Sequence, residues 1–229
     1  MSATSIAMPE REQGAQPIGA SIGDWKPPPA PPGVPLRGRN VRLEPLTPDH
    51  VESLWARLGA APPELWTYMA FGPFEDVGAF RDTLHALIQK DGWVPYAIAD
   101  GNGASGFASY LRIAPSDGAI EIGSIVLSPD LQRTTAATEA LFLMMDHVFD
   151  LGYRRCEWKC DSHNTPSRQA AIRLGFSYEG TFKKATHYKG RNRDTSWYAI
   201  VDDEWPAIRR GFLDWLDPSN FDDDGSQLV

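Results

Sequence analysis

The sequence predicts an α/β (α+β) fold in which helices cover a mixed central sheet of about seven strands. The first observation behind this prediction is that several segments alternate apolar and polar residues, as half-buried strands do. The second is that segments with apolar residues at helical spacing lie between only some of these strands. The chain has 229 residues, 42% of them hydrophobic, so it can form one or two domains with a substantial core.

The first half of the folded region is expected to contain two helices among its strands. In order, the elements are a strand at 40–46, helices at 48–58 and 74–90, and strands at 93–100, 105–113 and 119–127. The turn Asp-Gly-Asn-Gly at 100–103 predicts a hairpin between two of these strands. Residues 101–106 also match G-x-G-x-x-G, but a dinucleotide loop must open a helix, whereas an alternating strand follows here.

The second half is expected to alternate helices and strands before a final hairpin. In order, the elements are a helix at 135–151, a strand at 154–161, a helix at 165–175, strands at 176–188 and 194–202, and a helix at 204–215. The strand at 154–161 has Cys156, Trp158 and Cys160 on one face and charged residues on the other. Its two cysteines would lie about 13 Å apart at ~3.3 Å per residue, too far for a disulfide. Unpaired thiols predict a reducing, cytoplasmic setting, and without Cys-x-x-Cys spacing we expect no metal site.

Composition divides the chain into three parts. Residues 1–35 are rich in Gly, Pro, Ala and Ser, which predicts an arm or linker that Trp25 attaches to the domain; a free tail is an equally good interpretation. Residues 36–216 carry the regular patterns of one folded domain, and residues 217–229 form an acidic tail. Apolar runs are shorter than the ~20 residues that a membrane span needs, and no signal peptide is recognisable, so we expect no membrane partner.

A candidate anion site lies where the strand at 119–127 leads through Ser-Pro-Asp into a long apolar helix. This helix begins with a run of small and polar residues at 132–138. The first N–H groups of a helix lack intrahelical partners, and the helix dipole favours negative charge there. Small side chains would let a phosphate approach, and Arg133 could add a charge-assisted hydrogen bond. The alternative is ordinary capping by Thr134 or Thr135, which stabilises a helix by about 1 kcal/mol.

A second element favours the phosphate interpretation. Residues 164–176 place Asn164 and Ser167 at the front of a helix and the pair Gly175-Phe176 at its exit. Together with the run Ala-Thr-Glu-Ala at 137–140, this pattern resembles the Gcn5-related N-acetyltransferases. The resemblance is strongest to the branch of the ribosomal-protein alanine acetyltransferases, and it covers residues from about 38 to 203.

The resemblance implies a fold, a cofactor and a set of contact residues. Members of this family have helices on both faces of the sheet and two central parallel strands that splay apart, and they use acetyl-CoA. Their pyrophosphate pattern falls on residues 132–137 here, and their pantetheine arm pairs with the strand near Val126, where a backbone N–H can polarise the thioester carbonyl. The implied cofactor contacts are Ile125, Val126, Leu127, Gln132, Arg133, Thr134, Thr135, Ala136, Ala137, Thr138, Asn164, Ser167 and Arg168, and Asn164 and Ser167 are also implied in catalysis.

Two positions depart from the family pattern. Thr135 stands where the family usually has its first glycine, and it would be strained only if the backbone there had positive φ. Ala171 stands seven residues after Asn164, where many relatives carry a tyrosine that protonates the leaving thiolate. We therefore expect another group, or water, to supply that proton.

The reaction implied by the resemblance is direct attack of a primary amine on the acetyl group of acetyl-CoA, in a ternary complex. A lysine-like amine with a pKa of about 10.4 costs about 4.6 kcal/mol to deprotonate at pH 7, whereas an α-amine near ~8 costs about 1 kcal/mol. Glu121 is our candidate general base, because partial burial in an apolar strand would raise its pKa. The alternative is a strand-end glutamate in solvent or in an ion pair.

Other residues and functions stay open at this stage. His163 could relay protons, and His187 and Tyr188 could line the acceptor pocket, although surface hairpin residues are the simpler interpretation. The basic turn at 189–194 could contact an acidic group of the acceptor or the 3′-phosphate of the cofactor, or be solvated. The acceptor itself could be a peptide N-terminus, an amino acid, a polyamine or an antibiotic amine.

The expected partners are acetyl-CoA and an amine acceptor. The net charge of −8 disfavours nucleic acid as the main partner, although lysines and arginines between 183 and 193 keep an aminoacyl-tRNA donor open. Another acyl donor, or an acyl-CoA sensor without turnover, are further alternatives. The sequence is also compatible with a homodimer.

Overall fold

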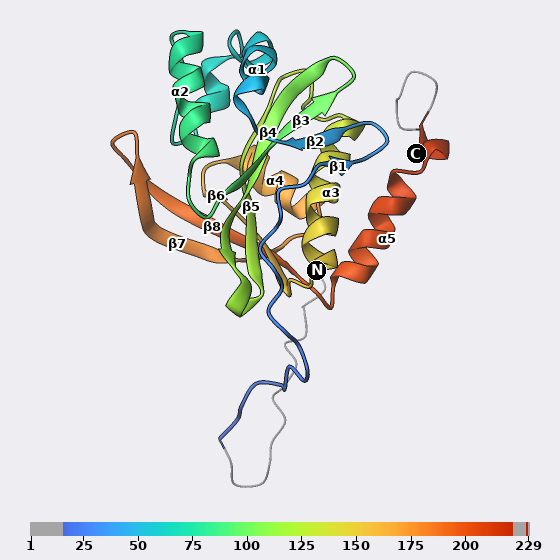
Figure 1. Ribbon diagram of the computed structural model, residues 1–229. Coiled ribbons are helices and arrows are strands. Elements are labelled where there is room, and N and C mark those ends of the chain that lie inside the picture. The colour runs from blue at the N-terminus through green and yellow to red at the C-terminus, as the bar shows by residue number, and fades with distance from the viewer. Residues whose placement is uncertain (1–15, 222–227, 229) are drawn as a thin grey trace.

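One sheet of eight strands forms the centre of the protein, in the order β1-β2-β3-β4-β5-β6-β8-β7 (Figure 1). The computed structural model describes residues 16–221 and residue 228. Neighbouring strands are antiparallel except β5 and β6, which are parallel. The predicted mixed sheet with helices is therefore confirmed.

The elements follow the predicted order. The first half holds β1 (Leu36–Arg37), β2 (Arg42–Pro45), α1 (Val51–Leu58), α2 (Val77–Ile88), β3 (Val94–Asp100), β4 (Gly103–Ala114) and β5 (Ala119–Leu127), with short 3-10 helices at Pro48–His50, Pro63–Trp66 (η2) and Pro115–Asp117. The second half holds α3 (Thr135–Asp150), β6 (Arg155–Asp161), α4 (Thr165–Arg173), β7 (Ser177–Tyr188), β8 (Arg191–Val201), α5 (Trp205–Trp215) and the 3-10 helix Pro218–Asn220. The sequence pattern does not predict β1, because a strand of two residues shows no periodicity.

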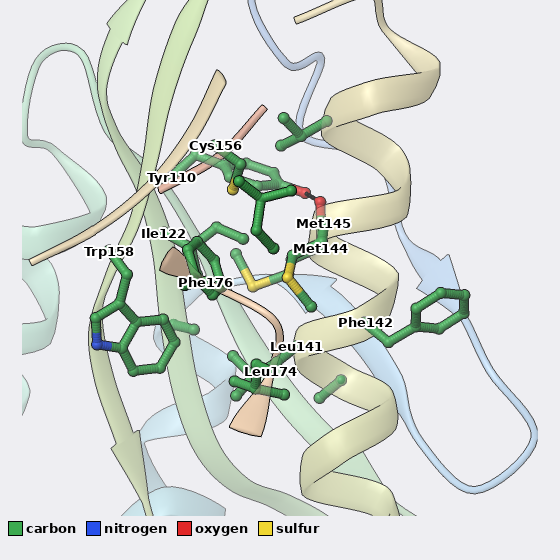
Figure 2. Packing of buried hydrophobic residues seen from close by; sticks show 14 of the residues in the cluster. Tyr110, Ile122, Leu141, Phe142, Met144, Met145, Cys156, Trp158, Leu174 and Phe176 are labelled. Atoms are coloured by element: carbon green, nitrogen blue, oxygen red, sulfur yellow. Dashed lines mark hydrogen bonds between the residues drawn. The ribbon is translucent and has the colours of Figure 1, made fainter. Parts of the chain in front are cut away.

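Two apolar layers hold the sheet between helices, as alternation along the strands requires. On one face, α3, α4 and α5 pack against the strands through a cluster that includes Ile122, Met144 and Trp158 (Figure 2). The buried hydroxyl of Tyr110 donates a hydrogen bond to the Met144 carbonyl at 2.8 Å, so this polar atom is satisfied inside the cluster. On the other face, α1 and α2 pack through a second cluster around Phe107.

The parallel strands β5 and β6 part soon after they meet. Only residues 119–121 of β5 pair with residues 155–157 of β6, although both strands continue beyond this point. On its other side, β5 has a bulge opposite β4: two residues, Ser124 and Ile125, stand opposite Ala108 alone, and Ser124 has a φ of 50°. The sheet is thus opened between β5 and β6, and this opening positions the candidate site.

Trp25 attaches the described part of the N-terminal arm to the domain. Its indole N–H donates a hydrogen bond to the Gly152 carbonyl at 3.3 Å, and the Arg154 guanidinium lies 5.6 Å from its ring centroid. Gly118 makes room for the ring, since a Cβ there would come within 2.7 Å of it. Residues 1–15 of the expected arm, and residues 222–227 and 229 of the expected acidic tail, lie outside the described residues. Where the structure is described, no helix is both long and apolar enough to cross a membrane.

Candidate active site

A cavity with a volume of about 600 Å³ lies where β5 and β6 part. Its walls come from β4, β5, β6, the front of α4, the β7–β8 hairpin, residues 68–71 after η2, and Lys90 and Trp93 between α2 and β3. Both faces of β6 contribute: Trp158 and Cys160 belong to its apolar face, and Lys159 and Asp161 to its charged face. This happens because the β5 side of β6 has no strand partner beyond Glu157. Of the predicted site residues, the cavity brings together Glu121, Ile125, Asn164, Ser167, His187 and Tyr188.

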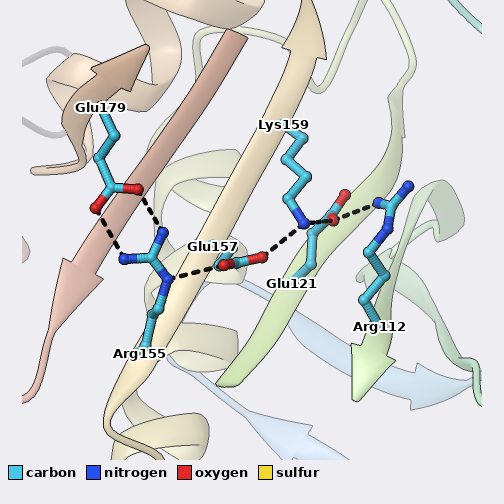
Figure 3. Close-up of polar contacts among 6 residues, drawn as sticks. All are labelled: Arg112, Glu121, Arg155, Glu157, Lys159 and Glu179. Atoms are coloured by element: carbon cyan, nitrogen blue, oxygen red, sulfur yellow. Dashed lines mark hydrogen bonds and ion pairs between the residues drawn. The ribbon is translucent and has the colours of Figure 1, made fainter. Parts of the chain in front are cut away.

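A chain of alternating charges crosses the sheet at the base of the cavity. Glu121 and Glu157 stand directly opposite each other on β5 and β6, an unfavourable arrangement by itself. The Lys159 ammonium lies between them, 3.1 Å from Glu121 and 2.6 Å from Glu157, and its side chain is only 4% exposed. Figure 3 shows that Arg112 and Arg155 extend the chain on either side, the latter reaching Glu179. The two opposed carboxylates are therefore compensated by the cation that they share.

Glu121, the predicted general base, is buried and ion-paired. Burial raises its pKa above the ordinary value, and Arg112 at 2.5 Å and Lys159 oppose this shift without cancelling it. Gly123 makes the arrangement possible, because a Cβ there would lie 2.9 Å from a Glu121 oxygen. The structure thus combines the two interpretations of the sequence: Glu121 has a raised pKa, and it is also a member of an ion pair.

The N-terminus of α3 is partly capped from within. Thr134 is the N-cap, and its hydroxyl accepts a hydrogen bond from the Ala137 amide at 3.1 Å, so the capping alternative applies to that amide. Within the described part of the chain, the amides of Thr135 and Ala136 donate to no protein acceptor. The left-handed backbone falls on Arg133, with a φ of 63°, and Thr135 begins the helix with ordinary geometry. Threonine in place of the family glycine is therefore unstrained.

The expected cofactor residues on β5 and before α3 are linked to each other. The Gln132 amide group donates a hydrogen bond to the Leu127 carbonyl at 3.0 Å. Since the next amide along, that of Ser128, donates to β4 through Ser105, the backbone groups of Leu127 point away from β4. The side chain of Val126, in contrast, is buried in the cluster beneath α1 and α2. At Val126 and Leu127, the backbone groups that point away from β4 are therefore those of Leu127.

The front of α4 has a structural explanation of its own. Asn164 caps the helix by accepting a hydrogen bond from the Ser167 amide at 3.1 Å, and the Ser167 hydroxyl accepts one from the Trp158 indole at 3.0 Å. Arg168 turns away from the cavity and donates to the Tyr198 hydroxyl at 3.1 Å. Ala171, at the position of the family tyrosine, is fully buried in the core and does not line the cavity.

Asp161 is a site residue that the sequence pattern does not single out. It is 5% exposed, and it accepts hydrogen bonds from the His163 amide at 2.9 Å and from the Tyr188 hydroxyl at 2.9 Å. Burial and the hydrogen bond to Asp161 raise the pKa of Tyr188 to about 12. His163 itself lines a neighbouring cavity, beside the β7–β8 turn, and its ring lies 3.0 Å from Asp161. In the described residues, no three His, Cys, Asp or Glu side chains are grouped to hold a metal ion.

Comparisons with known proteins identify the family. The model of the acetyltransferase (GNAT) domain matches residues 40–177. A GCN5-related N-acetyltransferase from Brucella melitensis is 41% identical, with a TM-score of 0.87 over 91% of this chain and 96% of that one. The N-acetyltransferase p20 of Bacillus licheniformis is 28% identical over 62% of this chain and 83% of its own length. The chain belongs to the GNAT acetyltransferase family and is an N-acetyltransferase, as the sequence motifs predict.

A ribosomal-protein acetyltransferase shares this fold. The enzyme from Salmonella typhimurium that modifies the N-terminal serine of ribosomal protein L7/L12 has a TM-score of 0.62 over 73% of this chain and 98% of its own. Its sequence identity is 24%, so this likeness supports the fold predicted from that branch and does not transfer its acceptor.

Proposed function

We propose that this chain transfers an acetyl group from acetyl-CoA to a primary amine, by direct attack in a ternary complex. The observation that carries this proposal is the parting of β5 and β6, which leaves the β5 edge unpaired beside a cavity and next to free amides on α3. When bound, acetyl-CoA supplies an acetyl group that is activated as a thioester.

The residues around β5 and α3 fit this cofactor. The free amides of Thr135 and Ala136 would hold its pyrophosphate, because nearby side chains are small and the helix dipole favours an anion. Arg133 lies one residue before the N-cap and is exposed, so its guanidinium can reach a phosphate. The backbone of Leu127, which points away from β4, would pair with the pantetheine arm.

Two proton transfers are needed, and residues on opposite sides of the β5–β6 opening would carry them out: Glu121 on β5 and Ser167 on α4. Glu121 would accept the proton of the acceptor ammonium, because burial raises the pKa of its carboxyl toward neutrality. Lys159 and Arg112 hold its carboxylate in place. Ser167, or water, would protonate the leaving thiolate, since Ala171 is buried and the Ser167 hydroxyl lines the cavity. The two unpaired, buried thiols also support a reducing, cytoplasmic setting.

The experiment for the cofactor site measures CoA binding by calorimetry. Ala136→Trp should weaken binding about tenfold or more, because a bulky side chain blocks approach to the free amides. Ala79→Trp, in the first turn of α2 on an exposed position, is the matched control and should leave binding unchanged. Unchanged affinity in both Ala136→Trp and Asn164→Ala would contradict the assignment.

The experiment for the base measures release of free CoA thiol with a panel of amines. Glu121→Gln should lower turnover more at pH 7 than at pH 9, because free amine becomes abundant as pH rises and needs no base. Equal losses at both pH values would remove Glu121 from this role.

A further inference from the structure

The charged side chains that line the cavity differ from the rest of the protein. The cavity has four cationic residues and two carboxylates, whereas the whole chain has a net charge of −8. Lys90 lies 3.8 Å from the Trp93 ring centroid, and Arg112 and Lys159 are paired with Glu121. Among the described residues, neither the Lys90 nor the Arg193 side chain has a carboxylate or carbonyl partner, but Lys90 is exposed to solvent, whereas the Nε of Arg193 is buried.

The backbone of Arg193 is paired within the sheet, and among the described residues no carboxylate contacts its guanidinium. It lies on β8 opposite Thr186, and its guanidinium is 5.8 Å from the ring centroid of Tyr188. Its Nε is buried and has no hydrogen-bond partner in the described structure. A buried, unpaired donor is rare in folded proteins because it has lost water and gained nothing in return. Such a group is explained if a ligand supplies the acceptor.

Two further unpaired polar atoms belong to the same cavity. The Trp197 indole N–H and the Ser124 hydroxyl are buried without partners among the described residues, and both residues line the cavity. The ring of Trp197 itself packs against the ring of Phe182, with centroids 4.8 Å apart, and both residues line the cavity. The cavity therefore offers unused hydrogen-bond donors next to an aromatic wall.

We propose that the acceptor amine carries a carboxylate, which Arg193 binds, and an apolar body, which packs on the aromatic wall. This inference rests on the proposed function and names its acceptor class: amines of the amino-acid type. A guanidinium presents donors in a planar fork that matches a carboxylate, which a neutral amide cannot replace in charge or geometry. The ammonium of the same acceptor would lie toward Glu121, so both ends of a zwitterion meet opposite charges.

A phosphate of the cofactor is the competing ligand for Arg193. The cavity that Arg193 lines includes no residue of the α3 N-terminus, where the pyrophosphate is placed. Arg193 instead lines the same cavity as Glu121, the proposed base that would accept the proton of the acceptor amine. The carboxylate of the acceptor is therefore the better match, and the cofactor phosphate becomes an outcome of the test.

The test compares three acceptors that differ at one group: phenylalanine, phenylalaninamide and 2-phenylethylamine. A second set, leucine, leucinamide and isopentylamine, repeats it with another apolar body. In the wild-type protein, kcat/KM from thiol release should be about tenfold or more higher for each carboxylate than for its two analogues. The amine of each amino-acid amide is less basic than that of the amino acid, so more of it is unprotonated and able to attack at pH 7. A preference for the amino acid over its amide therefore cannot come from amine basicity.

Two variants decide the role of Arg193. Arg193→Gln should lower kcat/KM for phenylalanine about tenfold or more and leave 2-phenylethylamine within about twofold, because only the former loses a charge-assisted hydrogen bond. Arg191→Gln is the matched control: it removes the same charge two residues away, outside this cavity, and should change neither acceptor. Equal kcat/KM for the three wild-type acceptors, or an equal loss on all of them in Arg193→Gln, would overturn the inference.

Binding separates this inference from the proposed function. Tryptophan fluorescence in the presence of CoA should show tighter binding of phenylalanine than of phenylalaninamide, and the difference should vanish in Arg193→Gln. No thiol release with any amine would contradict the proposed function, while this titration would still decide the inference. The absence of carboxylate-dependent binding, or weaker CoA binding in Arg193→Gln with acceptors unaffected, would overturn the inference.

Discussion

Two sets of polar groups lie in or beside the same cavity and differ in one respect. The charges that cross the sheet from Arg112 to Glu179 all have partners, whereas Arg193, Trp197 and Ser124 carry buried atoms that have none among the described residues. Removing one member of a buried pair is costly because its partner stays buried without a compensating charge or hydrogen bond. Removing a group that has no partner carries no such cost. From this difference we expect removal of a paired group to lower stability, and removal of an unpaired group to affect ligand binding with little change in stability.

The largest expected effect comes from removing the cation that the opposed carboxylates share. Lys159→Met should lower the free energy of unfolding by about 3–5 kcal/mol at pH 7, because Glu121 and Glu157 then face each other without it. The raised pKa of Glu121 also predicts how this effect depends on pH. As pH falls, the Glu121 carboxyl is the first of the two to be protonated, so the loss of unfolding free energy in Lys159→Met should become smaller. Urea unfolding at pH 7 and at pH 5 measures both parts.

Arg112→Met is the matched control for this prediction. The Arg112 side chain is 61% exposed, so solvent screens its pairing with Glu121 and its removal should cost less than about 1 kcal/mol. Equal losses in the two variants would break the comparison, since stability would then not follow burial of the paired charge.

The next effect tests a paired group that also lines the cavity. Burial raises the pKa of Asp161, but the hydrogen bonds from the His163 amide, the Tyr188 hydroxyl and the His163 ring outweigh it, so the pKa lies below its ordinary value. A lowered folded pKa stabilises the protein above the unfolded value of about 3.9, and this contribution is lost as pH falls through the folded value.

Asp161→Asn should therefore lower the free energy of unfolding by about 1–3 kcal/mol at pH 7. The difference from the wild type should diminish below pH of about 4, where the wild-type carboxyl gains its proton. Urea unfolding across this pH range provides the measurement, and Asp130→Asn, at an exposed ion pair with Arg57, is the control. A constant difference between Asp161→Asn and the wild type at every pH would show that the charge of Asp161 does not contribute.

The paired set also shows how far the sequence alone could lead. Alternation along 154–161 predicts that Lys159 and Asp161 share the charged face of β6, and they do. It does not predict that both side chains are buried, because the residues that pack on them come from the β7–β8 hairpin, distant in sequence: the Trp197 ring lies 3.6 Å from the Lys159 ammonium, and the Tyr188 hydroxyl donates to Asp161. Periodicity predicts on which face of a strand a side chain lies, but packing of segments distant in sequence decides whether that face is exposed to solvent.

The two helix fronts show the same limit. Motif resemblance predicts the fold and the order of elements around α3 and α4, and the structure and the family comparison confirm these. It does not predict that Thr134 already satisfies the Ala137 amide, or that positive φ falls on Arg133. Composition groups Arg193 with a basic turn, whereas in the structure it belongs to β8 and lines the cavity. Local sequence patterns predict where helices begin and where strands lie. Which donors and acceptors pair with one another depends on the packing of the whole chain, and the sequence pattern does not predict it.

The smallest expected effect on stability is the one that sharpens the comparison most. Arg193→Gln should leave the free energy of unfolding within about 0.5 kcal/mol of the wild type, because the buried Nε has no protein partner to lose. Urea unfolding of this variant beside Lys159→Met gives the contrast directly, since both remove one positive charge from the same cavity. A loss of several kcal/mol in Arg193→Gln would place Arg193 with the paired charges that hold the fold. A neutral result would show that Arg193 does not hold the fold, as its assignment to the unpaired set requires.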